Sequence, residues 1–204
     1  AFLPIDKRNN VYQAAMILKE RYGIQEGIKI SIDKHIPVAA GLGGGSTDCA
    51  AALRGMNRLW QLDLSMHELV SMGVEVGTDV PYCLYGTTSF IAGKGEIVRP
   101  LIPMPQSWVV LVKPRISVST RKIFQQVELE QLSHPDMYKL SEAILKQDYE
   151  MMLAHMGNSL EDVTIPKHPV VQQIKDCMLK YGADAALMSG SGPTVFALCK
   201  KYSR

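Results

Sequence analysis

A glycine-rich run in the first quarter of the chain constrains its fold more than any other feature. Four glycines lie within residues 41–45, and two hydroxyl residues and an acid follow at 46–48. Before the run, residues 28–32 alternate isoleucine with polar residues, which predicts a half-buried strand; after it comes a helical pattern. A strand, a glycine loop and a helix in this order are the context in which backbone N–H groups bind a phosphate. The simpler alternative is a flexible turn between a strand and a helix.

Two common phosphate loops do not fit this run. The P-loop requires Lys and then Ser or Thr after its last glycine, whereas Gly45 is followed directly by Ser46 and Thr47. The dinucleotide motif requires glycine at position 46, and an acid after a second strand about 20 residues later. Residues 62–64 at that distance lie between two helical patterns. The run is therefore a third kind of phosphate loop, or the plain turn.

Three segments of the chain resemble the motifs of one family, the GHMP kinases (galactokinase, homoserine kinase, mevalonate kinase and relatives). Residues 37–48 resemble the family's nucleotide loop, and residues 76–81 resemble the segment that holds its catalytic aspartate. Residues 189–194 resemble its third, glycine-rich motif. The resemblance covers essentially the whole chain. Spacing and residues 57–69 are most similar to members that act on a cytidine-diphosphate-linked methylerythritol.

The resemblance implies an α+β fold with the two-domain GHMP kinase architecture. Residues 1–104 would form a nucleotide-binding N-terminal domain of the ribosomal protein S5 domain 2-like type, without its first strands. Residues 105–204 would form a ferredoxin-like C-terminal domain without its last helix and strand. The chain begins at Ala1 in what reads as the middle of a domain. Since the segment with the family's catalytic lysine has no match here, the chain alone is expected to have little or no kinase activity.

The resemblance also implies a reaction: transfer of phosphate from ATP, with Mg²⁺, to the 2-hydroxyl of cytidine-diphosphate-linked methylerythritol in the methylerythritol phosphate route to isoprenoid precursors. Another GHMP kinase, acting on homoserine or a mevalonate compound, is an alternative. The acid at Asp48 is compatible with the mevalonate type. A second alternative is a non-catalytic sensor that binds nucleotide on the same fold. Asp79 speaks against a sensor, which has no use for a base.

The resemblance assigns roles to residues of all three motifs. Asp79 would be the catalytic base that takes or orients the proton of the acceptor hydroxyl. On residues alone, Asp79 also reads as the N-cap of a helix that begins near Val80 and Pro81. Thr120 and Phe124 fall near the expected cytidine, where Phe124 could stack on the base or instead pack in the core. Substrate contacts are also expected from Ser189, Gly190, Ser191 and Gly192. The nucleotide-binding residues would be Pro37, Val38, Ala39, Ala40, Gly41, Leu42, Gly43, Gly44, Gly45, Ser46 and Thr47.

Composition excludes several other classes of protein. The formal net charge of +2 among 204 residues is too small to argue for nucleic acid or a membrane surface as partner. The four cysteines, at positions 49, 83, 177 and 199, are far apart and form no C-x-x-C pair. This spacing argues against a structural metal site or disulfides and favours a reducing, cytoplasmic location. The five histidines show no metal-binding spacing.

Periodicity predicts the remaining elements. Residues 108–112 form a continuous apolar run, which predicts a strand buried on both faces. Ser65 and Glu68 form a capping-box pattern that predicts a helix start, and Asn9 and Gly23 bracket another helix. Prolines at 100, 103 and 105 mark the expected domain boundary. Helices are predicted over about 11–22, 46–60 (capped by Ser46 or Thr47), 66–73, 119–127, 136–146, 148–157 and 168–181. Strands are predicted over about 28–32, 87–92, 96–99, 108–112, 185–188 and 194–198.

Overall fold

The computed structural model describes residues 3–202, which fall into two compact units. The first unit comprises residues 3–38 and 43–101, and the second comprises residues 39–42 and 102–202. Both units combine helices and strands, so the predicted α+β class is confirmed. The four residues 39–42 belong with the second unit although the chain on either side of them belongs to the first.

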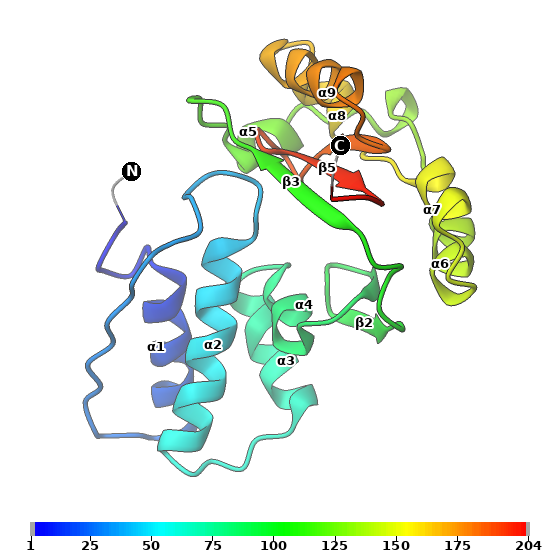
Figure 1. The fold of residues 1–204 in the computed structure, drawn as a ribbon. Coiled ribbons are helices and arrows are strands. Elements are labelled where there is room, and N and C mark those ends of the chain that lie inside the picture. The colour runs from blue at the N-terminus through cyan, green and yellow to red at the C-terminus, as the bar shows by residue number, and fades with distance from the viewer. Residues whose placement is uncertain (1–2, 203–204) are drawn as a thin grey trace. The chain divides into compact units, whose positions relative to one another are not determined.

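The first unit is a group of helices with one β-hairpin (Figure 1). Its interior is formed by fully buried side chains from all of these helices, among them Leu18, Leu53, Met72 and Leu84. The hairpin strands pair in antiparallel register, with Ser89 opposite Pro100. The elements are α1 (Asn10–Tyr22), α2 (Gly44–Leu59), α3 (Met66–Val76), α4 (Val80–Tyr85), β1 (Ser89–Ala92) and β2 (Ile97–Pro100).

Local sequence signals set both ends of α1 and the start of α3 as predicted, although α3 continues to Val76 and does not end near residue 73. The Asn9 side chain accepts a hydrogen bond from the amide of Val11, and Gly23 ends α1 in the left-handed conformation. At α3, Ser65 and Glu68 make both hydrogen bonds of the capping box. These signals act within a few residues, which is why they can be read directly from the sequence.

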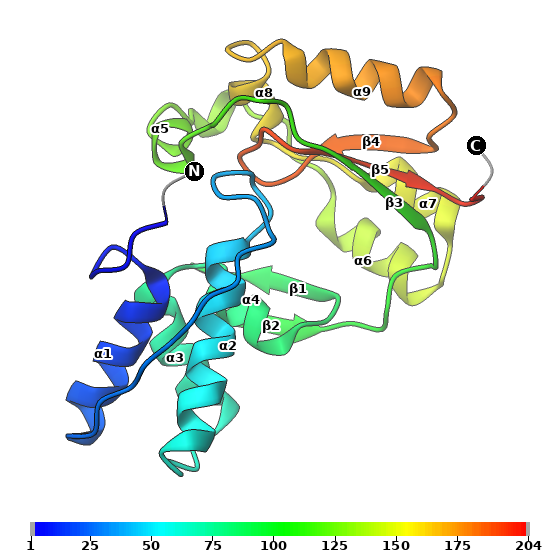
Figure 2. The ribbon, with the colours of Figure 1, turned by 60° about the vertical axis from the view of Figure 1, so that its left-hand side comes forward.

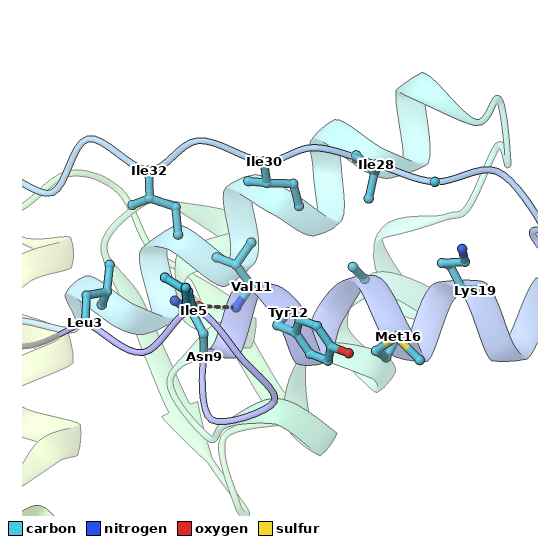
Figure 3. Close-up of a pocket in the computed structure, with 12 residues that line it drawn as sticks. Leu3, Ile5, Asn9, Val11, Tyr12, Met16, Lys19, Ile28, Ile30 and Ile32 are labelled. Atoms are coloured by element: carbon cyan, nitrogen blue, oxygen red, sulfur yellow. Dashed lines mark hydrogen bonds between the residues drawn. The ribbon is translucent and has the colours of Figure 1, made fainter.

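The predicted strand at residues 28–32 is wrong. The chain there runs alongside α1 without pairing to any strand of the described residues. Ile28, Ile30 and Ile32 do point to one side, as the alternation predicts, and together with Val11 and Met16 of α1 they line an apolar hollow of about 520 Å³ (Figure 3). Alternation sets which way side chains point, whereas a strand also needs a neighbouring backbone to bond.

Helix α2 begins two residues earlier than predicted and is capped differently. Its first residue is Gly44, and its N-cap is Gly43 in a left-handed conformation, without any side-chain cap. The expected caps, Ser46 and Thr47, both lie inside the first turn; the Thr47 hydroxyl donates to the carbonyl oxygen of Gly43 at 3.1 Å. Glycine can start the helix because it adopts positive φ without steric strain.

The second unit contains a three-stranded antiparallel sheet in the order β3-β5-β4, with helices packed on it (Figure 2). The strands are β3 (Trp108–Val112), β4 (Ala185–Met188) and β5 (Val195–Cys199). The helices are α5 (Thr120–Phe124), η1 (Leu129–Gln131), α6 (Met137–Leu145), α7 (Tyr149–His155), α8 (Glu161–Thr164) and α9 (Val170–Lys180).

Side chains of β5 alternate between two hydrophobic clusters, and β4 contributes to one of them. Met188 and Val195 pack with Val171 of α9, whereas Leu198 packs with Met152 of α7. The two clusters draw their strand residues from β4 and β5 alone, so the inner strand and one edge of the sheet carry the core of this unit.

Two predictions for the second unit are corrected. The strand at 108–112 exists, but it is not buried: each of its residues is exposed, from 37% at Val112 to 55% at Val109. Among the strands of residues 3–202 it pairs with β5 alone, at the edge of the sheet, and an apolar run does not reveal whether a helix covers it. Helix α5 ends at Phe124 and not at residue 127: the amide of Gln125 still bonds four residues back, to Arg121, but those of Gln126 and Val127 bond only three residues back.

Across residues 3–202, the helices are too short or too polar to span a bilayer.

Candidate active site

The glycine loop owes its path to residues with positive φ. Ala39, Gly41 and Gly43 have φ values of 52°, 75° and 63°. A Cβ atom on Gly41 would lie 2.2 Å from the carbonyl oxygen of Ser189, so only glycine fits at this position. Among the predicted loop residues Ala40 and Gly44 are buried, Val38, Gly41, Leu42, Gly43 and Ser46 are half-buried, and Pro37, Ala39, Gly45 and Thr47 are exposed.

The second unit brings two of the predicted motifs into contact. The Ser189 hydroxyl donates a hydrogen bond of 2.7 Å to the carbonyl oxygen of Gly41, and the amide of Thr194 donates one of 3.3 Å to that of Ala40. Gly190 also lies against Gly41, with a Cβ position 3.3 Å from its carbonyl oxygen. The residues 39–42 are therefore held by the loop at 189–194, which is 148 residues away in sequence.

The amide groups of residues 41–46 donate no hydrogen bond to any described residue. Those of Gly44, Gly45 and Ser46 form the first turn of α2, where amides have no partner within the helix. Thr47 is the first amide in the series that is bonded, to the carbonyl oxygen of Gly43 at 2.9 Å. Consecutive free amides at the start of a 16-residue helix form a site suited to an anion.

Lys34 lies at this helix start, and sequence reasoning did not identify it. Its ammonium group donates to the carbonyl oxygen of Gly44 at 2.7 Å and forms an ion pair with Asp48. A Cβ atom on Gly44 would lie 2.7 Å from the Ile36 Cγ2 atom and 2.9 Å from the Lys34 Nζ atom, so both side chains would have to move to admit it. Lys34 lies just beyond the alternating segment at 28–32 and belongs to none of the three motifs, so no local pattern in the sequence marks it.

Asp79 stands directly before α4, as predicted, but it does not cap the helix with its side chain. Its carboxylate is exposed and has no hydrogen-bond partner among residues 3–202. Helix α4 packs on α2 through Cys83, whose Sγ atom is 3.6 Å from the Thr47 hydroxyl. Burial raises the pKa of the Cys83 thiol, and the negative charge of Asp79 adds to this shift.

The two residues predicted to lie near the cytidine, Thr120 and Phe124, have different surroundings: Thr120 contacts another predicted substrate residue, whereas the Phe124 ring is exposed. The Thr120 hydroxyl is 2.7 Å from the Ser191 hydroxyl, so two predicted substrate residues that are 71 apart in sequence meet. Phe124, at the end of α5, is 59% exposed and does not pack in the core. Its ring is therefore available to a ligand.

The last residue of the 189–194 loop, Thr194, carries a buried hydroxyl group. Thr194 is 0% exposed, and its hydroxyl has no hydrogen-bond partner in the described part of the chain. Thr164 is equally buried, but its hydroxyl donates to the carbonyl oxygen of Ser191 at 3.3 Å. The loop therefore carries one buried hydroxyl without a partner, that of Thr194, and accepts a hydrogen bond from a second, that of Thr164 in α8.

The described residues contain no cluster of three or more His, Cys, Asp or Glu side chains that could hold a metal ion. A dedicated protein cage for a metal is therefore absent from residues 3–202. This does not affect a magnesium ion that is bound mainly by phosphate oxygens, which needs few protein ligands.

Comparison with protein families gives two matches that follow each other along the chain. Residues 9–87 match the GHMP kinases N terminal domain, and residues 140–204 match the GHMP kinases C terminal domain.

The chain is also similar to curated proteins over its whole length. It is 62% identical over 204 residues to 4-diphosphocytidyl-2-C-methyl-D-erythritol kinase of Enterococcus faecalis and covers 72% of that protein. Identity to the protein of the same name from Levilactobacillus brevis is 55%, again with 72% of that protein covered. The chain thus spans somewhat less than three quarters of the length of these relatives.

Solved structures give the same similarity in three dimensions. A crystal structure of 4-(cytidine 5'-diphospho)-2C-methyl-D-erythritol kinase matches with a TM-score of 0.78 and 29% identity, over 96% of this chain and 70% of that chain. A homoserine kinase from Cytophaga hutchinsonii matches with a TM-score of 0.83 over 98% of this chain and 69% of that chain. At 24% sequence identity, this match shows that the two chains share a fold and nothing about function.

Proposed function

Because the chain belongs to the GHMP kinase family, we propose that it transfers the γ-phosphate of ATP to the 2-hydroxyl of 4-diphosphocytidyl-2-C-methyl-D-erythritol. The observation that carries this proposal is the 62% identity, over every residue of the chain, to a relative named for that activity. The activity belongs to the methylerythritol phosphate route to isoprenoid precursors.

The glycine loop is assigned to the nucleotide phosphates. Six consecutive unbonded amides, from Gly41 to Ser46, supply donors to phosphate oxygens without any rearrangement of existing hydrogen bonds. The amino end of α2 adds a favourable helix dipole for the negative charge. Phosphoryl transfer requires positioning and charge stabilisation rather than covalent chemistry from the protein, and both are properties of this loop.

Asp79 is assigned to the acceptor hydroxyl. Its carboxylate is exposed and unbonded, so it can accept the proton of the attacking hydroxyl. Thr120 and Phe124 are assigned to the cytidine end of the acceptor, where the exposed ring of Phe124 can stack on the base.

The residues present also fit a magnesium ion that arrives with ATP. The Ser46 hydroxyl makes no hydrogen bond with a described residue, and it would help phosphate oxygens to hold the ion. When bound, the ion would neutralise charge that develops on the transferred phosphoryl group. Asp48 is engaged by Lys34 and is not assigned to the metal.

An assay of ADP release with a panel of acceptors tests the proposal. The complete polypeptide is given ATP and Mg²⁺ with 4-diphosphocytidyl-2-C-methyl-D-erythritol, homoserine, mevalonate or phosphomevalonate in separate reactions. The first acceptor alone is expected to support turnover. ADP release with homoserine or a mevalonate compound only would reject the assignment, and nucleotide binding without turnover on any acceptor would indicate a sensor.

A further inference from the structure

The loop at residues 189–194 is held from the side of α8 by three side chains of residues 158–164, here called the loop clamp: Asn158, Glu161 and Thr164. Glu161 accepts a hydrogen bond of 2.6 Å from the amide of Met188 and forms an ion pair with Lys175 in which both side chains are 13% exposed. Thr164 donates to the carbonyl oxygen of Ser191 at 3.3 Å. Neither residue belongs to the motifs that the sequence singled out.

Asn158 makes the most extensive contact of the loop clamp. Its Nδ2 group donates two hydrogen bonds, each of 2.8 Å, to the carbonyl oxygens of Met188 and Gly190. Its Oδ1 atom accepts a third, of 3.0 Å, from the amide of Leu160. Both hydrogens of the side-chain amide are thus donated, one to the end of β4 and one to the loop. No other side chain of this size combines two such donors with an acceptor.

The bond to Gly190 sets the direction of the next amide. In a trans peptide the carbonyl and the following N–H point in opposite directions, and the only cis peptide of the described chain is Gly192–Pro193. Because the carbonyl of Gly190 points to Asn158, the amide of Ser191 points to the opposite side of the loop. That amide, like the amide of Gly190, donates to no described residue.

Gly190 would otherwise have little to fix it. It is exposed, has a left-handed φ of 57° and lies between two residues whose hydroxyls are already bonded, Ser189 to Gly41 and Ser191 to Thr120. Glycine moves easily between backbone conformations, so a side-chain contact to its carbonyl decides which one is populated.

We propose that Asn158 is a positioning residue for phosphoryl transfer: it orients the peptide between Gly190 and Ser191 so that the free amides of the loop face the bound substrate. The proposal rests on the kinase function given above and on the role assigned to the 189–194 loop. Asn158 itself touches no substrate and acts only through the loop.

The test replaces Asn158 with Asp, which is close to isosteric. The carboxylate keeps the acceptor for Leu160 but loses both donors to the loop. We expect kcat to fall by at least roughly tenfold, with a smaller change in KM for ATP, because misplaced groups lose most in the transition state. Asn158→Ser, which also keeps a local acceptor but cannot reach the carbonyls, is the second variant in case Asp prevents folding.

A matched control separates positioning from stability. Asp136→Ala removes two N-cap hydrogen bonds from α6 in the same unit, to the amides of Tyr138 and Lys139, without touching the loop. It should lower thermal stability but leave kcat unchanged. Wild-type kcat in both folded Asn158 variants would overturn the proposal.

A second measurement does not depend on activity. Hydrogen exchange at the amides of Ser189 and Gly192, which bond to Thr194 and Ser189 within the loop, should be at least roughly tenfold faster in Asn158→Asp than in the wild type. If hydrogen exchange at these two amides is unchanged in Asn158→Asp, Asn158 does not hold the loop, even where kcat falls as expected. Faster exchange in a protein that turns over no acceptor would keep the clamp and reject the kinase function instead.

Discussion

Lys34 and Asp48 form an ion pair at the amino end of α2, the helix that follows the glycine loop. Their side chains are only 14% and 23% exposed, and the Lys34 ammonium also bonds the carbonyl oxygen of Gly44. A cation at a helix amino end opposes the helix dipole, so Asp48 compensates a charge that would otherwise be unfavourable there. The pair ties the segment before the loop to the helix after it, within the first unit.

Removal of Asp48 should therefore be costly. Asp48→Ala leaves the Lys34 ammonium largely buried without a counter-charge, and we expect a loss of about 2 kcal/mol in the free energy of unfolding. Urea unfolding measures the loss. Asp33→Ala is the control: Asp33 pairs with His35 where both side chains are more than four fifths exposed, so its loss should cost less than about 0.5 kcal/mol. Equal losses in the two variants would show that the Lys34–Asp48 pair stabilises the fold no more than an exposed ion pair does.

Gly41→Ala should disrupt the contact between the two loops of the second unit. The new Cβ atom would lie 2.2 Å from the carbonyl oxygen of Ser189, in addition to the strain of a φ of 75°. We expect a destabilisation of about 3 kcal/mol, of which positive φ alone accounts for about 1 kcal/mol. Gly23→Ala provides the control, since Gly23 has a φ of 65° and nothing within 4 Å of its Cβ position. If both variants lose the same stability, the steric argument for Gly41 fails.

How much could be read from the sequence depended on the distance over which each signal acts. The cap at Asn9 and the capping box of Ser65 and Glu68 act over three residues, and the sequence predicted both. Whether residues 28–32 form a strand and whether Trp108–Val112 are buried depends on which backbone or helix lies alongside, and both predictions were wrong. Periodicity records the preference of one segment and not the presence of its neighbours.

The same limit applies to the candidate site. Its motifs are short, so the glycine loop, Asp79 and the 189–194 loop could be proposed from residues and resemblance. Lys34 and Asn158 escaped notice because their partners lie 10 to 32 residues away and because neither belongs to a motif. A polar side chain becomes informative only when the backbone carbonyls that it bonds are known.

Asp79→Asn tests the assignment of the base. The amide cannot take a proton from the acceptor hydroxyl, so kcat should fall by roughly 10²–10⁴-fold, while KM for ATP changes less than about twofold. Stability should hardly change, because the exposed Asp79 carboxylate bonds nothing in residues 3–202. Asp63→Asn, at another exposed aspartate, should leave kcat as it is. A near-normal kcat in Asp79→Asn would remove the base from the proposed mechanism.

Two buried threonines, Thr194 in the 189–194 loop and Thr164 of α8, which bonds to that loop, should respond to valine in opposite directions. Thr194→Val removes a hydroxyl that has no partner among the described residues, so we expect unfolding to require about 1 kcal/mol more. Thr164→Val breaks the hydrogen bond to Ser191 and leaves its carbonyl oxygen without that donor, so we expect a loss of about 1 kcal/mol. Urea unfolding of both variants gives the comparison, and a loss in Thr194→Val would mean that its hydroxyl is bonded in solution.

The buried thiol of Cys49 predicts a pH dependence of stability. Burial raises the pKa of this fully buried thiol from 9.0 to about 12, so the unfolded chain releases the proton first. The stabilising contribution is complete below pH 9.0 and is lost as pH rises toward 12. At about pH 10.5 the wild type should have lost about 2 kcal/mol through this group.

Urea unfolding at pH 8 and at about pH 10.5 measures that loss in the wild type, in Cys49→Ala and in Cys177→Ala. Cys49→Ala should lose about 2 kcal/mol less than the wild type over this interval, since the alanine has no proton to release. Cys177→Ala, which removes an exposed thiol, should behave like the wild type. If the alkaline loss is the same in all three proteins, Cys49 does not titrate in this range, and its contribution to the first unit is packing alone.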